Sequence, residues 1–226
     1  MRFQLEGYAR SARILHPVLA FMLLLAIVFS SPLGGTPAQI RSGALTTIGD
    51  LTALSFPICA WAARGLLDNE PDAQRHIGVV ALGRSRAMLC GLIAAAGFTA
   101  GLALVASAYP LAAAVLYGVR PSVLLPAVGL ILLSALAATA LGALTSRAIL
   151  PSPGWSILVL LGVYVADLLL GLGPLRILTV PMIEWMGAAG RGASAFTSGL
   201  PWFALRTLAW TALATALYVR LRRTRV

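Results

Sequence analysis

Residues 65–86, GLLDNEPDAQRHIGVVALGRSR, form the main charged stretch of an otherwise apolar chain. The stretch holds three of the seven carboxylates, three arginines and one of the two histidines. The flanking sequence is so apolar that 59% of the 226 residues are hydrophobic and 11% are charged. A soluble domain cannot bury that much apolar surface, so the composition predicts an integral membrane protein.

The apolar runs are long enough for about six spanning helices, since each needs roughly 20 residues to cross the hydrocarbon core. We expect these spans at residues 14–31, 44–63, 87–109, 122–146, 155–172 and 201–219. The sequence therefore predicts a single all-α transmembrane domain over residues 1–226. Gly97 and Gly101 form a G-x-x-x-G pair that favours helix packing, as does the small-residue run SALAATALGALTS in the fourth span.

Two segments outside the spans are predicted to lie at the membrane surface. Charged residues recur at helical spacing near the start of the chain, at Arg2, Glu6, Arg10 and Arg13. This spacing predicts an interfacial amphipathic helix over residues 1–13, with a basic tail as the alternative. Residues 173–200 contain too few polar side chains for an aqueous loop. We expect one or two short helices dipping into the outer interface there, anchored by Trp185 and Trp202.

The distribution of arginine predicts the orientation. All 17 basic residues are arginine, which is typical of a GC-rich bacterial genome. With the N-terminus inside, twelve arginines fall on the cytoplasmic side, four on the other side and Arg206 within a span. The positive-inside rule thus predicts cytoplasmic termini, a cytoplasmic segment 65–86 and a location in the bacterial cytoplasmic membrane. The arginines lack interleaved aromatic residues, so no nucleic-acid partner is expected.

The sequence offers little support for catalysis or for a metal site. Without lysine, the chain cannot carry the phosphate-binding loop G-x-x-x-x-G-K-[ST], and it contains no H-E-x-x-H motif. The densest group of metal-ligating residue types consists of Asp68, Glu70, Asp72 and His76. We interpret this group as a solvated loop. We therefore expect no metal and no cofactor bound by this chain.

Three ionisable residues fall at or within the predicted spans, namely Asp50, Asp167 and Arg206. A charge at mid-membrane costs about 3 kcal/mol on insertion scales and usually faces an opposite charge or a cavity. Asp167 and Arg206 both fall in the outer half of their spans. An ion pair between them is therefore one prediction, and side chains that stay solvated at the outer boundary are the alternative.

The charged stretch also has the signals of a short cytoplasmic helix. Asp68 or Asn69 can cap its N-terminus. Pro71 suits the first turn, and the charge of Asp72 is favourable there. A stiff, charged helix between two spans is suited to docking a cytoplasmic partner.

Together, these features resemble the permease subunit of type-2 ATP-binding-cassette (ABC) exporters. The shared features are an amphipathic N-terminal helix, six spans with both ends inside, a charged helix between spans two and three, and a semi-buried outer segment between spans five and six. Within residues 65–86, the order of Asp68, Glu70 and Arg75, followed by an apolar stretch ending in ALGRSR, is similar to that family's pattern. The connector here is shorter than usual and lacks lysine, and no ATPase is fused to it.

The resemblance implies that residues 65–86 are a coupling helix seated in a cleft of a separate ATPase subunit. The candidate docking residues are Asp68, Glu70, Asp72, Arg75, His76, Arg84 and Arg86. Two ATPase copies would bind ATP and Mg²⁺, and a second permease chain, identical or related, would complete the route through the bilayer. The chain itself would be no enzyme. The cargo would be amphipathic or hydrophobic, such as a drug, an antibiotic, a lipid or a peptide.

Two other functions are compatible with the sequence. The membrane subunit of an energy-coupling-factor importer also has about six spans in a chain of similar length, and it would bind a vitamin without any ATPase. An intramembrane enzyme would be active as the purified chain alone.

Overall fold

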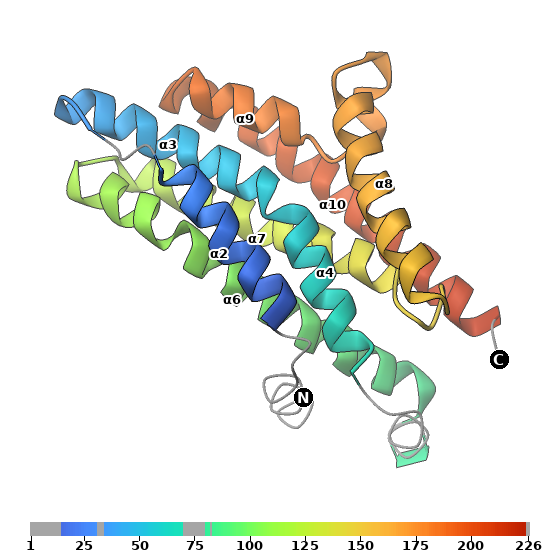
Figure 1. The fold of residues 1–226 in the computed structure, drawn as a ribbon. Coiled ribbons are helices and arrows are strands. Elements are labelled where there is room, and N and C mark those ends of the chain that lie inside the picture. Colours follow the sequence, from blue (N-terminus) through green and yellow to red (C-terminus); the bar gives the residue numbers. More distant parts are fainter. Residues whose placement is uncertain (1–14, 31–33, 70–79, 82, 225–226) are drawn as a thin grey trace.

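The computed structural model describes residues 15–30, 34–69, 80–81 and 83–224, and every element in these ranges is helical. The all-α prediction is therefore confirmed. The elements are α2 (Leu15–Val28), α3 (Pro37–Leu54), α4 (Phe56–Leu67), α6 (Arg84–Leu116), α7 (Pro121–Leu144), α8 (Pro153–Gly171), the 3₁₀ helix η2 (Pro174–Leu178), α9 (Met182–Gly190) and α10 (Ala193–Thr224). Most of the helices run along one diagonal in Figure 1, and α8 stands away from the others.

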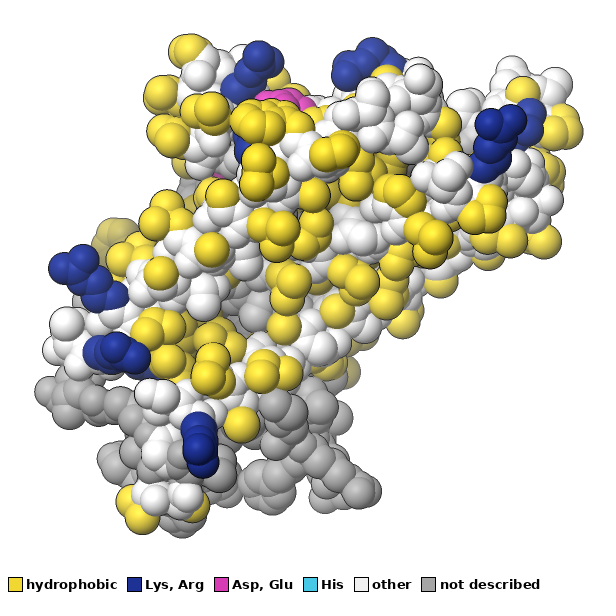
Figure 2. All heavy atoms as spheres, turned by 180° about the vertical axis from the view of Figure 1, so that it is seen from behind, with side chains coloured by type: hydrophobic (Ala, Val, Ile, Leu, Met, Phe, Trp, Pro, Cys, Tyr) yellow, Lys and Arg dark blue, Asp and Glu magenta, His cyan; other side chains and the backbone are white. Residues whose placement is uncertain are grey.

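Three described helices, α6, α7 and α8, are long and apolar enough to cross a membrane. The bent pair α3 and α4 passes the same test if it counts as one span. Apolar side chains also cover the middle of the face in Figure 2, with arginines along its periphery. These helices indicate a membrane protein, and the described part of the chain contains three or four candidate spans. The expected first and sixth spans correspond to α2, of 14 residues, and α10, which fall outside this class, so six crossings stay a prediction.

Helix α7 lies at the centre of the bundle. It packs against α4, α6 and α10, and 13 of its 24 residues are buried. Most of the buried residues in its second half are alanine, which lets the neighbouring backbones approach closely. Thr99 of α6 and Thr139 of α7 add a buried hydroxyl–hydroxyl hydrogen bond of 2.8 Å. The small-residue run of the fourth span thus makes the tight packing expected of it.

A proline explains the 42° bend between α3 and α4. Pro57 has no N–H to donate to the carbonyl of Ala53, and its ring crowds that carbonyl, so the regular helix is interrupted. The neighbouring helices supply donors at the break. Ser134 of α7 donates to the carbonyl of Thr52 at 3.1 Å, and the Tyr164 hydroxyl of α8 donates to that of Ala53 at 3.5 Å. In an apolar environment, such side-chain donors make a broken helix tolerable.

A close contact between two helices uses a different glycine from the predicted pair. Gly97 and Gly101 are exposed on α6, and no atom lies within 4 Å of the position that a Cβ would take at either residue. Their predicted packing is thus not made by a described helix of this chain. At Gly142, by contrast, a Cβ would lie 2.4 Å from the carbonyl oxygen of Ala60 and 2.9 Å from the Cβ of Ala63. The spacing of two glycines shows that they share a helix face, but it cannot show which face meets a neighbour.

Residues 173–200 contain two short helices, as predicted, but also the start of a long one. They comprise η2, α9 and the first turns of α10, which begins at Ala193 rather than at the expected residue 201. Helix α9 packs against α3 and α10. The interfacial role predicted for Trp185 is wrong, because its side chain is 0% exposed in the main core, whereas Trp202 is half exposed at 48%. The packing of α9 against two long helices buries Trp185.

Candidate functional site

The end of α4, where the charged stretch begins, carries a buried pair of opposite charges. Arg64 and Asp68 are one helical turn apart, and the side chains are 9% and 7% exposed. Arg64 Nε lies 3.6 Å from Asp68 Oδ2, which allows electrostatic attraction but is too long for a good hydrogen bond. Their i,i+4 spacing was a signal available in the sequence for this contact.

Both members of the pair bind the link between α7 and α8. Asp68 Oδ1 accepts a hydrogen bond of 2.8 Å from the backbone N–H of Arg147, and Arg64 Nη2 donates to the carbonyl of Pro153 at 3.4 Å. In the first turn of α8, the buried Ser156 hydroxyl donates to the carbonyl of Thr145, the C-cap of α7. The start of the charged stretch is therefore tied to the C-terminal end of α7 and to the N-terminal end of α8. We call this group of contacts the α4 anchor.

The α4 anchor corrects one predicted docking residue. Asp68 was expected to face a partner, but its carboxylate is buried and binds within the chain. Arg86, in the first turn of α6, is exposed and stays a docking candidate. The other candidates lie outside the described residues or, for Arg84, have a side chain outside them: Glu70, Asp72, Arg75, His76 and Arg84.

We expect Asp68→Ala to lower the free energy of unfolding by about 2 kcal/mol, because it removes a buried, charged hydrogen-bond acceptor. Asp68→Asn should cost less, since the amide oxygen can still accept from the N–H of Arg147. Thermal unfolding of the purified chain in a mild detergent measures both effects. Arg86→Ala is the matched control at an exposed position. Equal unfolding temperatures for Asp68→Ala and the control would contradict a stabilising anchor.

A second buried polar group joins α8, α9 and α10. Arg206 of α10 is 7% exposed, and its Nη1 donates to Glu184 Oε1 of α9 at 2.6 Å. Its Nη2 donates to the carbonyls of Arg176 and Thr179, the latter at 3.2 Å. The guanidinium also lies 6.0 Å from the ring centroid of Trp202, within cation–π range. One side chain thereby holds the chain that connects η2 to α9.

The predicted ion pair between Asp167 and Arg206 is corrected by this geometry. Arg206 takes Glu184 as its carboxylate partner, while Asp167 Oδ1 accepts from the backbone N–H of Val180 at 3.0 Å. Both charged side chains are buried, and they bind adjacent residues of the same connecting segment. Sequence reasoning missed Glu184, because a sequence separation of 22 residues from Arg206 provides no periodic signal. We call this group the outer clasp.

The contacts of both polar groups are made within the chain. The α4 anchor and the outer clasp contain carboxylates and arginines that satisfy backbone groups, with no histidine or cysteine among the contacts described above. Among the described residues, no three His, Cys, Asp or Glu side chains gather as potential metal ligands. The arrangement of these charges is suited to holding segments together.

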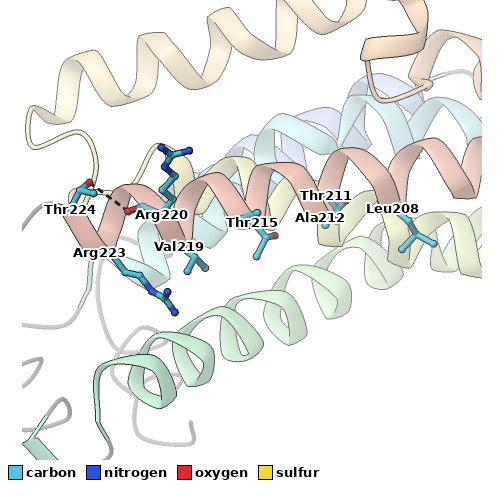
Figure 3. Close-up of a pocket in the computed structure, with 9 residues that line it drawn as sticks. Leu208, Thr211, Ala212, Thr215, Val219, Arg220, Arg223 and Thr224 are labelled. Carbon is cyan, nitrogen blue, oxygen red and sulfur yellow. Dashed lines mark hydrogen bonds between the residues drawn. The ribbon is translucent and has the colours of Figure 1, made fainter.

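A groove of about 850 Å³ runs along the exposed face of α10. Leu208, Thr215, Val219 and Arg223 project from the same side of the helix in Figure 3, toward the space beside α6. The groove combines apolar and hydroxyl side chains along most of its length with arginines at its C-terminal end. An amphipathic molecule with a negatively charged group matches this distribution of side chains.

No similarity to known proteins assigns this chain to a family. Comparison with protein-family models, with curated proteins and with solved structures found no match to this chain.

Proposed function

We propose that the chain is the transmembrane permease subunit of a type-2 ABC exporter in a bacterial cytoplasmic membrane. The observation that carries this proposal is the α4 anchor. A partner that moved residues 65–86 would pull on Arg64 and Asp68 at the end of α4. Because these residues bind the link between α7 and α8, the movement would reach two more spans. A coupling helix needs such a rigid connection to the spanning helices.

The proposed orientation is supported by the residues at this end of the bundle. The start of α6, the end of α7, the α7–α8 link and the last turns of α10 meet in one apolar cluster: Met88, Ala143, Ile149 and Tyr218. The same end of α10 carries Arg220, Arg222 and Arg223. Such a concentration of arginine is typical of the cytoplasmic side. Both chain termini are accordingly proposed to be cytoplasmic.

In the proposed mechanism, the chemistry of ATP takes place in a partner. Two copies of a separate ATPase subunit would bind ATP and Mg²⁺ and close on each other. The coupling helix would transmit that closure to the spans of this chain and of a second permease chain, identical or related. Cargo would cross by alternating exposure of the space between the two permeases. This chain would supply binding and movement and no covalent step.

The α10 groove supports an amphipathic cargo. Its hydroxyl and apolar side chains, among them Thr211, Thr215 and Val219, can contact a hydrophobic body, and Arg220 and Arg223 can attract a charged end. A second permease packed beside this face would turn the open groove into an enclosed path. An amphipathic drug, antibiotic, lipid or peptide is the proposed class of compound.

Reversing charge in the coupling segment tests the proposal. The variant Glu70→Arg, Asp72→Arg, Arg75→Glu leaves the α4 anchor intact and alters three candidate docking residues. We expect the wild-type chain, purified from its own membranes in a mild detergent, to carry an ATPase with a phosphate-binding loop. The variant should retain at most about a tenth of that ATPase, since like charges across an interface cost several kcal/mol. Subunit content and ATP hydrolysis of the purified complex measure the effect.

The matched control is Arg191→Glu at the exposed turn between α9 and α10, which should leave the ATPase bound. Wild-type chain that purifies without an ATPase would contradict the proposal. Tight binding of a vitamin by that isolated chain would instead favour the importer subunit. Turnover of a substrate by the chain alone would favour a membrane enzyme.

A further inference from the structure

A pocket of about 650 Å³ lies at the end of the bundle opposite the α4 anchor. Three separate parts of the chain line it: the first half of α3, the turn between α6 and α7 with the start of α7, and the turn between α9 and α10 with the start of α10. In Figure 1 these parts lie together at one end, and α3, α7 and α10 all run away from it. The pocket is therefore built by the tertiary fold and not by one helix.

The charged side chains that line this pocket are both arginines, set among apolar and hydroxyl side chains. Arg41 of α3 and Arg120 before α7 contribute two positive charges, and neither makes an ion pair or hydrogen bond through its side chain with any described residue. The hydroxyls of Ser122 and Ser194 are likewise not bonded to described residues. No carboxylate is among the lining residues. A pocket with two unpaired arginines and no negative charge is electrostatically complementary to an anion.

The backbone adds to this preference. Helices α3, α7 and α10 begin at Pro37, Pro121 and Ala193, so three helix N-termini lie beside the pocket, and the Thr36 side chain caps that of α3 by accepting from the N–H of Gln39. N-termini carry partial positive charge and favour anions. The turns that bring two of them together contain Gly118 and Gly192, with φ of +77° and +104°, which other residues rarely adopt. Here the N-termini strengthen a site that the cavity and its arginines define.

We propose that this pocket binds a phosphate-bearing ligand, with Arg41 and Arg120 as its principal contacts. The guanidinium group presents planar, paired donors that match phosphate oxygens. The volume exceeds that of a single phosphate ion, so the pocket also accommodates an organic group attached to it. The source of the phosphate is a lipid headgroup or a small soluble phosphate compound. This site does not rest on the proposed transport function.

Ligand-dependent thermal unfolding of the purified full chain in a non-ionic detergent tests the site. The probes are inorganic phosphate, glycerol 3-phosphate and dihexanoyl phosphatidylglycerol, with dihexanoylglycerol as the analogue that lacks phosphate. We expect phosphate-bearing probes to raise the unfolding temperature of the wild-type chain in a saturable way. Arg41→Gln and Arg120→Gln should each raise the dissociation constant for the phosphate-bearing probes at least about tenfold. This change corresponds to the loss of one charged hydrogen bond.

Arg191→Gln is the matched control, since Arg191 is an exposed arginine on the neighbouring turn and does not line the pocket. It should leave the dissociation constants unchanged, and all three variants should unfold like the wild type without ligand. Binding of all three phosphate probes supports the site and identifies a soluble phosphate as sufficient, whereas binding of the phospholipid alone supports it as a headgroup site. No binding of any phosphate probe, equal binding of dihexanoylglycerol, or binding unaffected by both pocket variants would overturn the proposal.

Discussion

Replacing Arg206 with leucine is expected to lower the free energy of unfolding by about 3–5 kcal/mol, the typical cost of removing one partner from a buried ion pair. The change leaves the carboxylate of Glu184 without its 2.6 Å partner. It also leaves the carbonyls of Arg176 and Thr179 without their guanidinium donor. Arg206→Lys should recover only part of the loss, because an ammonium group cannot bind a carboxylate and two carbonyls in the same planar geometry.

Equilibrium unfolding in mixed micelles, with a denaturing detergent as titrant, measures this loss. The double variant Arg206→Leu, Glu184→Leu should be more stable than Arg206→Leu alone, since it leaves no unpaired charge. Arg191→Leu, at an exposed position, is the control and should unfold like the wild type. If Arg206→Leu unfolded like this control, the outer clasp would contribute nothing to stability.

Gly142→Leu is expected to destabilise the chain by about 3 kcal/mol or more, at the upper end of the range for overpacked cores. The new side chain would start 2.4 Å from the carbonyl oxygen of Ala60 and 3.0 Å from the backbone nitrogen of Arg64. Both are backbone atoms of α4, so a rotation of one side chain cannot make room. Separation of α4 from α7 would also disturb the nearby α4 anchor. Unfolding in mixed micelles measures the stability.

The same substitution at Gly129 is the matched control. Gly129 also lies in α7, but no atom is within 4 Å of the position of a Cβ there. Gly129→Leu should therefore stay within about 0.5 kcal/mol of the wild type, as is usual away from packed contacts. Equal destabilisation by both changes would mean that leucine acts through the helix itself and not through contact with α4.

The class of fold was predictable from local patterns. Apolar runs such as residues 122–146 predict helices because a bilayer leaves backbone groups no water to bind. The predicted limits of the fourth span agree with α7, Pro121–Leu144, within two residues at each end. Proline at position 57 was likewise visible, but the sequence could not show that Ser134 and Tyr164 would supply donors at the resulting bend.

The functional candidates were less predictable, because each depends on which segments meet. Asp68 was assigned to an external partner, because the resemblance to ABC permeases implied that it belongs to a coupling helix. Its actual partner, the N–H of Arg147, is 79 residues away in the chain. No pattern in the sequence pointed to Glu184 as the partner of Arg206. Arg41 and Arg120 became candidate binding residues only because the fold places them around one pocket.

The sequence by itself determined that this protein is a helical membrane protein with one concentrated charged connector, because hydropathy and charge act on each segment separately. The tertiary structure alone decided that the connector begins at a buried anchor, that Arg206 pairs with Glu184, and that three helix starts form a basic pocket. The physical reason is burial for the anchor and for the Arg206–Glu184 pair, whereas the exposed arginines of the pocket are brought together only by the packing of the helices that carry them. A buried charge must find a partner, and the partners come from segments that only the packing of the helices brings together.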